Sequence, residues 1–229
     1  MTIRLKLSCC RMNTTSSPRR VRGPYRRSRA TQEAILDAAL AEFAQNGFRK
    51  GSMKTVAEKI GMSEAGMLHH FPSKNALLAA VLKRNDDLSG ALDVESMGGR
   101  RVLEEFIARV GENATRPGVT QLYCVLSAEA SDPDHPARDF FVERYRILRG
   151  VAREALADMR RSGELREGVT PESGSIAFVA MMDGVQLQWL IEKGEIDMQG
   201  EMLDYYRRNL LAEHLDVPAV AASEPTTHA

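Results

Sequence analysis

Apolar residues recur at helical spacing along most of the chain, and no segment alternates apolar and polar positions as a half-buried strand does. In residues 31–46, for example, Leu36, Leu40 and Phe43 fall on one face of a helix. Gly47 follows where a left-handed C-cap is expected. The pattern predicts an all-α fold.

Two short helices joined by a tight turn are predicted next. Ser52 is the expected N-cap of the first, which ends at Gly61. Ser63 is the expected N-cap of the second, which is limited to 64–70 because Pro72 disfavours helical geometry at the residue before it. Two such helices are typical of a helix-turn-helix, in which the second helix enters the major groove of DNA.

A larger set of helices is predicted after the helix-turn-helix, and one of them is apolar on two faces. This helix, 171–192, must be covered twice. We expect one face to lie in its own domain and the other, with 198–215, to meet the same pair of helices from a second copy. The expected helices are 74–92, with Leu88 on its buried face, 100–115, which Pro117-Gly118 ends, 119–130, a long helix ending at 161, 171–192 and 198–215.

The charges divide between the two parts of the chain, although the net charge of the 229 residues is zero. Residues 1–85 hold 16 Lys+Arg against 5 Asp+Glu, which gives +11, and the remainder holds 15 against 26, which gives −11. This asymmetry indicates a first part that binds a polyanion. We expect the arginine-rich residues 1–28 and the tail 216–229 to be disordered.

Other classes of protein find little support in the sequence. No uninterrupted apolar run reaches the length of about 20 residues that a membrane span needs, and the basic start lacks the apolar block of a secretory signal. Three cysteines form neither a disulfide framework nor a zinc-ligand spacing, so a cytoplasmic location is expected, with no metal and no cofactor. No nucleophile elbow, phosphate loop or catalytic acid pair indicates an enzyme.

The segment SMKTVAEKIGMSEAGMLHHFPSKNALL, residues 52–78, closely resembles the DNA-binding signature of the tetracycline-repressor (TetR) family. The most specific elements are the turn at 61–63, the His-His-Phe end of the second short helix and the Pro-Ser-Lys start of the next one. The resemblance implies a three-helix DNA-binding domain at 29–76 and a larger helical domain at 77–215, which binds a small molecule and forms a homodimer.

The resemblance also implies which residues contact DNA, and two positions depart from the family pattern. The family's usual tyrosine before the His-His pair is Leu68 here, and Gly66 stands where Thr or Asn is common. We therefore expect affinity to depend on Lys54, Lys74 and the N-terminal arginines. The implied contacts are Ser63, Glu64, Gly66 and His69 toward bases or groove phosphates, His70 and Lys74 toward backbone phosphates, and Ser52, Met53 and Lys54 toward the flanking backbone.

Several of these features have a simpler interpretation. The arginine-rich arm could lie in a minor groove, or it could be a solvated leader or the product of an upstream start codon. Glu64 could accept a hydrogen bond from a cytosine amino group, or it could only complement the helix dipole. His69 and His70 point about 100° apart on a helix, which disfavours a shared metal ion.

In TetR-like proteins the ligand cavity lies among the helices of the larger domain, so we looked there for polar groups within apolar stripes. Asp183 needs a partner if it is buried, and Arg146, a tyrosine hydroxyl or a ligand could supply one. Each candidate could instead be an ordinary core or interface residue. The candidates are Tyr123, Cys124, Ser127, Tyr145, Arg146, Asp183, Gln186 and Trp189.

The function implied is a ligand-responsive transcription factor, more in keeping with a repressor than an activator. Two symmetric readers about 34–36 Å apart would bind a palindromic double-stranded operator. A small-molecule effector would release the DNA by changing the dimer geometry, with the helix that starts at Lys74 as the carrier. The alternatives are an enzyme and an architectural DNA-binding protein without a ligand cavity.

Overall fold

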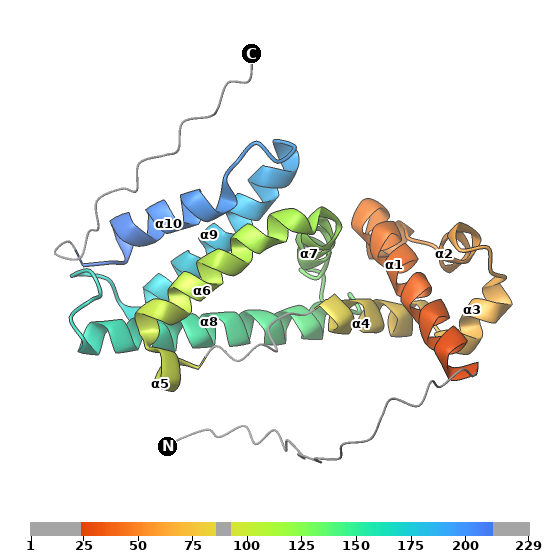
Figure 1. The fold of residues 1–229 in the computed structure, drawn as a ribbon, viewed down its shortest axis with the longest axis horizontal. Helices are drawn as coiled ribbons and strands as arrows, with labels where there is room; N and C mark the ends of the chain where they lie inside the picture. The colour runs from red at the N-terminus through yellow and green to blue at the C-terminus, as the bar shows by residue number, and fades with distance from the viewer. Residues whose placement is uncertain (1–23, 86–92, 213–229) are drawn as a thin grey trace, which may run out of the picture.

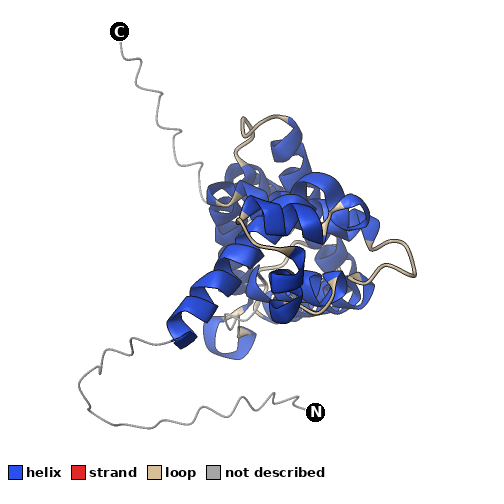
Figure 2. Ribbon diagram, turned by 90° about the vertical axis from the view of Figure 1, so that its right-hand side faces the viewer, coloured by secondary structure: helices blue, strands red, loops and turns tan. Residues whose placement is uncertain are grey.

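The computed structural model describes residues 24–85 and 93–212, and in these residues the all-α fold class is confirmed (Figures 1 and 2). An isolated bridge between Leu165 and Leu211 is the only extended pairing there. Residues 24–28, the last part of the arm 1–28 that was expected to be disordered, are helical. The rest of the arm, residues 1–23, lies outside the described residues, as do the predicted continuation of the fourth helix over 86–92 and the tail 216–229.

Helices α1, α2 and α3, where the sequence predicts a three-helix DNA-binding domain, lie at one end of the molecule, and α4 leads from them toward the rest (Figure 1). The remaining helices form a longer bundle at the other end. The bounds are α1 (Pro24–Lys50), α2 (Met53–Lys59), α3 (Glu64–His70), α4 (Lys74–Asn85), α5 (Val94–Met97), α6 (Gly99–Glu112), η2 (Asn113–Thr115), α7 (Pro117–Glu129), α8 (Arg138–Arg161), α9 (Pro171–Ile191) and α10 (Met198–Asn209).

Serine caps set the bounds of the short helices, as the sequence predicts. The Ser52 hydroxyl accepts from the Thr55 amide at 3.3 Å, and the Ser63 hydroxyl accepts from the Gly66 amide at 3.1 Å. Each cap satisfies an amide that the first helical turn leaves without a partner. The predicted starts of α2 and α3 are therefore confirmed.

Some predicted helix bounds are wrong, and proline explains two of them. The first helix begins at Pro24 rather than at residue 31, and the third helix of the larger part begins at Pro117, which the sequence analysis took as a terminator. The fixed φ of proline suits the first turn of a helix, where its missing N–H costs nothing. The short helix α5 was not predicted.

Two apolar cores hold the molecule together, and α7 contributes to the first of them. Leu122 and Leu126 of α7 and Phe141 of α8 pack into the same cluster as the buried side chains of α1 to α4. The second cluster joins α5, α6, α8, α9 and α10. The division at residues 76 and 77 stays a prediction, because α4 runs across it without interruption.

The expectation that α10 supplies a subunit interface is wrong for its apolar face. Met202, Tyr206, Leu210 and Leu211 are buried in the core of their own chain. The same spacing that fits a second copy also fits α6 and α9, and these neighbours already cover the face.

α9 is one described helix that is long and apolar enough to meet the composition of a membrane span. Four of its apolar side chains, Phe178, Val179, Met182 and Val185, are buried in the second core. Part of its apolar character therefore serves packing within the chain.

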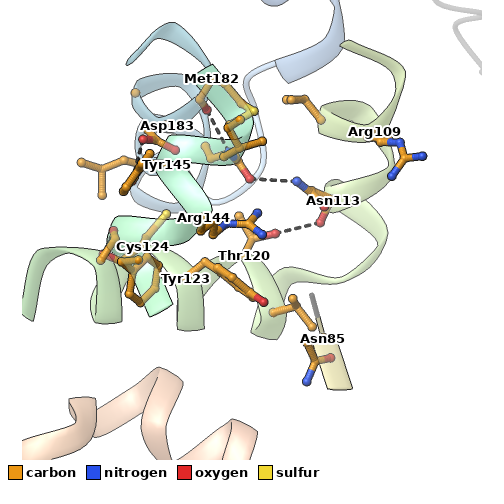
Figure 3. A pocket seen from close by; sticks show the side chains of 18 of the residues that line it. Asn85, Arg109, Asn113, Thr120, Tyr123, Cys124, Arg144, Tyr145, Met182 and Asp183 are labelled. Atoms are coloured by element: carbon orange, nitrogen blue, oxygen red, sulfur yellow. Dashed lines mark hydrogen bonds between the residues drawn. The ribbon is translucent and has the colours of Figure 1, made fainter. Parts of the chain in front are cut away.

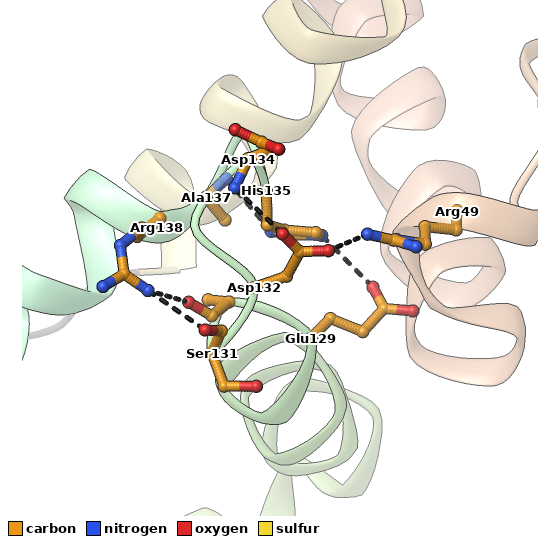
Figure 4. A network of polar contacts seen from close by, with 9 residues as sticks. Arg49, Glu129, Ser131, Asp132, Asp134, His135, Ala137 and Arg138 are labelled. Atoms are coloured by element: carbon orange, nitrogen blue, oxygen red, sulfur yellow. Dashed lines mark hydrogen bonds and ion pairs between the residues drawn. The ribbon is translucent and has the colours of Figure 1, made fainter.

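A polar junction joins the end of α1 to the loop between α7 and α8 (Figure 4). The Glu129 carboxylate accepts from the Phe48 amide at 2.7 Å and lies 3.3 Å from Nε2 of the buried His135. Arg49 forms an ion pair with Asp132. These contacts fix the last turn of α1 against the larger part of the molecule.

Gly47 is required at this junction for two reasons. Its φ of 69° lies in the left-handed region, and a Cβ atom there would overlap the Glu129 carboxylate. The backbone break at Gly47 lets the chain turn so that Phe48 can donate its amide to Glu129.

A buried carboxylate fixes α2 on α1. Glu42 is 3% exposed and accepts from Lys59 at 2.8 Å, from the Asn46 side chain at 3.1 Å and from the Ser52 amide at 3.4 Å. Burial alone would raise the pKa of Glu42, but the hydrogen bonds from Lys59 and Asn46 outweigh it and the pKa is lowered. The ionised form therefore stabilises the arrangement of the first two helices.

We expect Glu42→Gln to lower the free energy of unfolding by about 1–2 kcal/mol at pH 7, because a charge-assisted hydrogen bond is lost. The folded pKa lies below the unfolded one, so this contribution is present above the unfolded pKa and is lost as the pH falls through the folded pKa. Urea unfolding at pH 7 and at decreasing pH measures both effects. Glu58→Gln, at an exposed position on α2, is the control, and equal losses in the two variants would contradict the prediction.

Candidate nucleic-acid interface and ligand cavity

α3 is held as a short helix with one side on the core and the other in solvent. Met67 of α3 is completely buried, whereas Ser63, Glu64 and His69 are exposed. Leu68, on the same helix, is 43% exposed. The outer side of α3 thus presents the residues that the sequence analysis assigned to the groove of DNA.

Local packing explains why a glycine occupies position 66. A Cβ atom at this position would lie 3.2 Å from both the Met62 side chain and the Ser63 hydroxyl. A larger residue would displace the Met62 side chain and the Ser63 hydroxyl, which caps α3. The departure from the Thr or Asn of the family therefore coincides with a tightly packed first turn.

The start of α2 contributes one exposed cation. Lys54 has a side chain that is 71% exposed, with Glu58 at 3.9 Å as a distant partner. Met53 packs partly on the first core, and the Ser52 hydroxyl is engaged as the cap. Of these three predicted backbone contacts, Lys54 has the charge and the exposure to meet a phosphate.

Lys74, at the start of α4, is held against the end of α1. Its Nζ donates to the Arg49 carbonyl at 3.2 Å and lies 4.5 Å from the centroid of the Phe48 ring. Burial lowers the pKa of Lys74, and the charges of Glu129 and Glu42 oppose this effect. An ammonium group has three N–H donors, so this contact does not exhaust it. His70 lies half-buried at the end of α3.

The larger part of the molecule contains a partly open cavity of about 460 Å³ (Figure 3). This volume is in the range of sites for small organic ligands. The end of α4 and the helices α6, α7, α8 and α9 supply its wall. Six of the predicted candidates line the cavity: Tyr123, Cys124, Ser127, Tyr145, Asp183 and Gln186.

The structure identifies the partner of Asp183. The Tyr145 hydroxyl donates to its carboxylate at 2.7 Å, which is one of the alternatives that the sequence left open. Burial raises the pKa of Asp183 and also that of Tyr145. Burial, with a smaller contribution from the Asp183 charge, raises the pKa of the Cys124 thiol to about 11, so this thiol is protonated at neutral pH.

Two predicted candidates lie outside the cavity. Arg146 is 69% exposed and pairs with Glu143 at 2.6 Å, because it points away from the buried side of α8. Trp189 lines the second core near the turn at Gly194 instead of the cavity wall. Neither residue belongs to the cavity wall.

Arg144 and other polar residues of the wall were not predicted from the sequence. Arg144 lies three positions after Phe141 and four before Leu148, both buried, so the helical phase of α8 places it inward. This signal was available in the sequence. The other polar lining residues missed are Asn85, Arg109, Asn113, Arg116 and Thr120.

Polar contacts tie the end of α4 to the cavity. The Asn85 side chain accepts from Arg116 at 3.1 Å, and the Tyr123 hydroxyl donates to the Leu82 carbonyl at 3.3 Å. Deeper in the wall, Asn113 donates to Gln186 at 2.9 Å (Figure 3). Helix α4 therefore begins beside the α3 surface and ends in the cavity wall.

No group of three metal-ligating side chains occurs in the part of the chain that the structure describes.

Comparison with known proteins points to one family. Residues 35–81 match the family described as bacterial regulatory proteins, tetR family. The HTH-type transcriptional regulator RutR of Escherichia coli (strain K12) is 44% identical over 66 residues, which are 28% of this chain and 31% of RutR. The chain thus matches less than a third of the length of this relative.

Solved structures extend the likeness to the larger helical part. A putative transcriptional regulator from Saccharomonospora viridis in complex with choline has a TM-score of 0.65 at 19% identity, over 80% of this chain and 98% of that one. SmeT in complex with triclosan has a TM-score of 0.62 at 21% identity, over 87% of this chain and all of that one. At these identities the likeness shows a shared fold.

Proposed function

Because the chain belongs to the tetR family of bacterial regulatory proteins, we propose that it is a DNA-binding transcriptional regulator that represses its target and is released by a small-molecule effector. The observation that carries this proposal is that α4 connects the exposed α3 surface to a partly open cavity. The cavity favours a ligand-responsive regulator over an architectural DNA-binding protein. The two solved relatives that hold choline and triclosan give further support.

The proposed DNA contacts are the exposed residues of α3, with Lys54 of α2 and Lys74 of α4 as phosphate contacts. Ser63, Glu64 and His69 face solvent on α3, and Leu68 offers an apolar surface to a base such as thymine. Because Leu68 lacks the phenolic hydroxyl of the family's usual tyrosine, we expect the affinity for DNA to depend more on Lys54 and Lys74.

Operator binding is tested with the full chain and a duplex selected from a random pool. Lys54→Gln removes one phosphate contact per subunit, so we expect the slope of log K against log salt to fall in magnitude by about 2 for a dimer, with weaker binding at low salt. Fluorescence anisotropy at several salt concentrations measures the slope and the affinity. Lys193→Gln, exposed beyond α9, is the control, and an equal slope in both variants would remove Lys54 from the interface.

The proposed dimer interface lies on α8 and α9, which pack against each other and expose apolar side chains. On α9, Ile176, Leu187 and Ile191 are 60%, 51% and 70% exposed, and their spacing places them in one stripe. Val142 and Ile147 are exposed on α8. A two-fold contact would cover this stripe and pair two DNA readers.

We expect Leu187→Glu to raise the dimer dissociation constant at least 100-fold, because it places a charge in an apolar interface. Sedimentation equilibrium measures the dissociation constant, and circular dichroism reports whether the fold is retained. Gln121→Glu, which adds the same charge at an exposed position of α7, should leave the dimer unchanged. A folded Leu187→Glu chain that dimerises like the unsubstituted chain would place the interface elsewhere.

α4 is the proposed carrier of the signal between the cavity and DNA. We expect binding of the selected duplex to change amide hydrogen exchange at residues 82–85 and 116–120 as well as in α3, since Asn85 and Arg116 are hydrogen-bonded. In Asn85→Ala the change at 116–120 should be lost while that in α3 remains. Changes confined to α2, α3 and the first turn of α4 in the unsubstituted chain would contradict this route.

A further inference from the structure

The wall of the cavity carries an excess of positive charge. Its charged side chains are Arg109, Arg116, Arg144 and Asp183, which give a formal charge of +2 when Asp183 is ionised. Protonation of Asp183 would make the wall more positive. A cleft lined by charges of one sign, with low-dielectric walls, strengthens the effect of these charges on a bound ion.

Asp183, the one carboxylate among the described residues of the wall, is already engaged within the chain. The Tyr145 hydroxyl donates to it at 2.7 Å, and the Arg144 charge favours its ionised form. Its pKa is nevertheless raised, because burial has the larger effect. A cationic ligand would have to compete with these partners and with three arginines for a single carboxylate.

Arg144 is well placed to bind an anion. Its guanidinium carbon lies 4.5 Å from the centroid of the Tyr123 ring, and in Figure 3 it lies among the polar groups of the cavity. Stacking on an aromatic ring orients a guanidinium, whose planar set of N–H donors matches a carboxylate in a bidentate geometry. The stem of Arg144 leaves α8 on its buried side, between Phe141 and Leu148.

Apolar side chains form much of the remaining wall, so a fully polar anion would leave them without a complementary surface. Phe106 and Phe141 supply aromatic surface from α6 and α8, and Val110, Leu148 and Met182 supply aliphatic surface. A ligand that fills the cavity therefore needs an apolar body in addition to its charge.

We propose that the cavity binds a small amphipathic carboxylate, in which an aromatic or apolar body packs on Phe106, Phe141 and Met182 and the carboxylate pairs with Arg144. This inference rests on the proposed function, in which the cavity is the effector site, and it assigns the chemical class of the effector. Arg109 and Arg116 add to the positive potential of the wall.

Three probes of similar shape and different charge test the proposal: 2-naphthoate, the neutral 2-naphthamide and the cationic 2-naphthylmethylammonium. Isothermal titration calorimetry on the full chain measures their affinities. We expect 2-naphthoate to bind at least 10-fold more tightly than the amide, and the cation to bind most weakly. A preference for the cation, equal affinity for all three, or no binding of 2-naphthoate would overturn the proposal.

Three variants on α8 distinguish a direct contact of Arg144 with the carboxylate from a general effect of charge. Arg144→Gln should weaken 2-naphthoate at least 10-fold and leave the amide unchanged, whereas Arg146→Gln, exposed and outside the cavity, should change neither. Arg144→Lys should restore part of the affinity and guards against a folding defect. Equal 2-naphthoate affinity in Arg144→Gln and the unsubstituted chain would overturn the assignment of Arg144.

Operator binding by the same preparations distinguishes this proposal from the proposed function. A chain that binds the selected duplex but prefers the cation, with that preference lost in Asp183→Asn, overturns the carboxylate and leaves the regulator intact. A chain that binds 2-naphthoate through Arg144 but no duplex supports the carboxylate site and contradicts the regulator.

Discussion

The arrangement of the molecule depends on how the end of α1 is fixed to the end of α7. The Phe48 amide would be a helix-terminal donor without a partner if the Glu129 carboxylate did not accept from it. Gly47 makes this approach possible, because its backbone is left-handed and it leaves room for the carboxylate. Orientation of the α2–α3 pair thus follows from a polar contact as well as from apolar packing.

The cavity shows a related use of polar groups inside an apolar bundle. Buried polar atoms are costly unless they are hydrogen-bonded, and the Tyr145–Asp183 and Asn113–Gln186 pairs meet this requirement without a ligand. Each pair joins two different helices. The wall is therefore organised before any small molecule enters, which reduces the ordering cost of binding.

The bounds of the short helices were predictable from neighbouring residues alone, whereas the cavity wall and the covering of α10 depend on tertiary contacts. Ser52 and Ser63 were identifiable because a cap needs only its own first turn. The helical phase of α8 distinguishes Arg144, which lies between the buried Phe141 and Leu148, from Arg146, which lies on the exposed side of the helix. The sequence could not show what covers the apolar face of α10. A face covered by the same chain and a face covered by a second copy have the same spacing of apolar residues.

Leu122 and Leu126 of α7 complete the apolar cluster beneath the first four helices, although they lie more than thirty residues further along the chain. A fragment cut after α4 would leave that surface facing water, and the truncated reader would be expected to aggregate or to lose its fixed packing. Transferring α1 to α4 to another protein would therefore require transferring α7 with them. In this protein the first four helices share a core with α7 and α8 and are not separable from them at the end of α4.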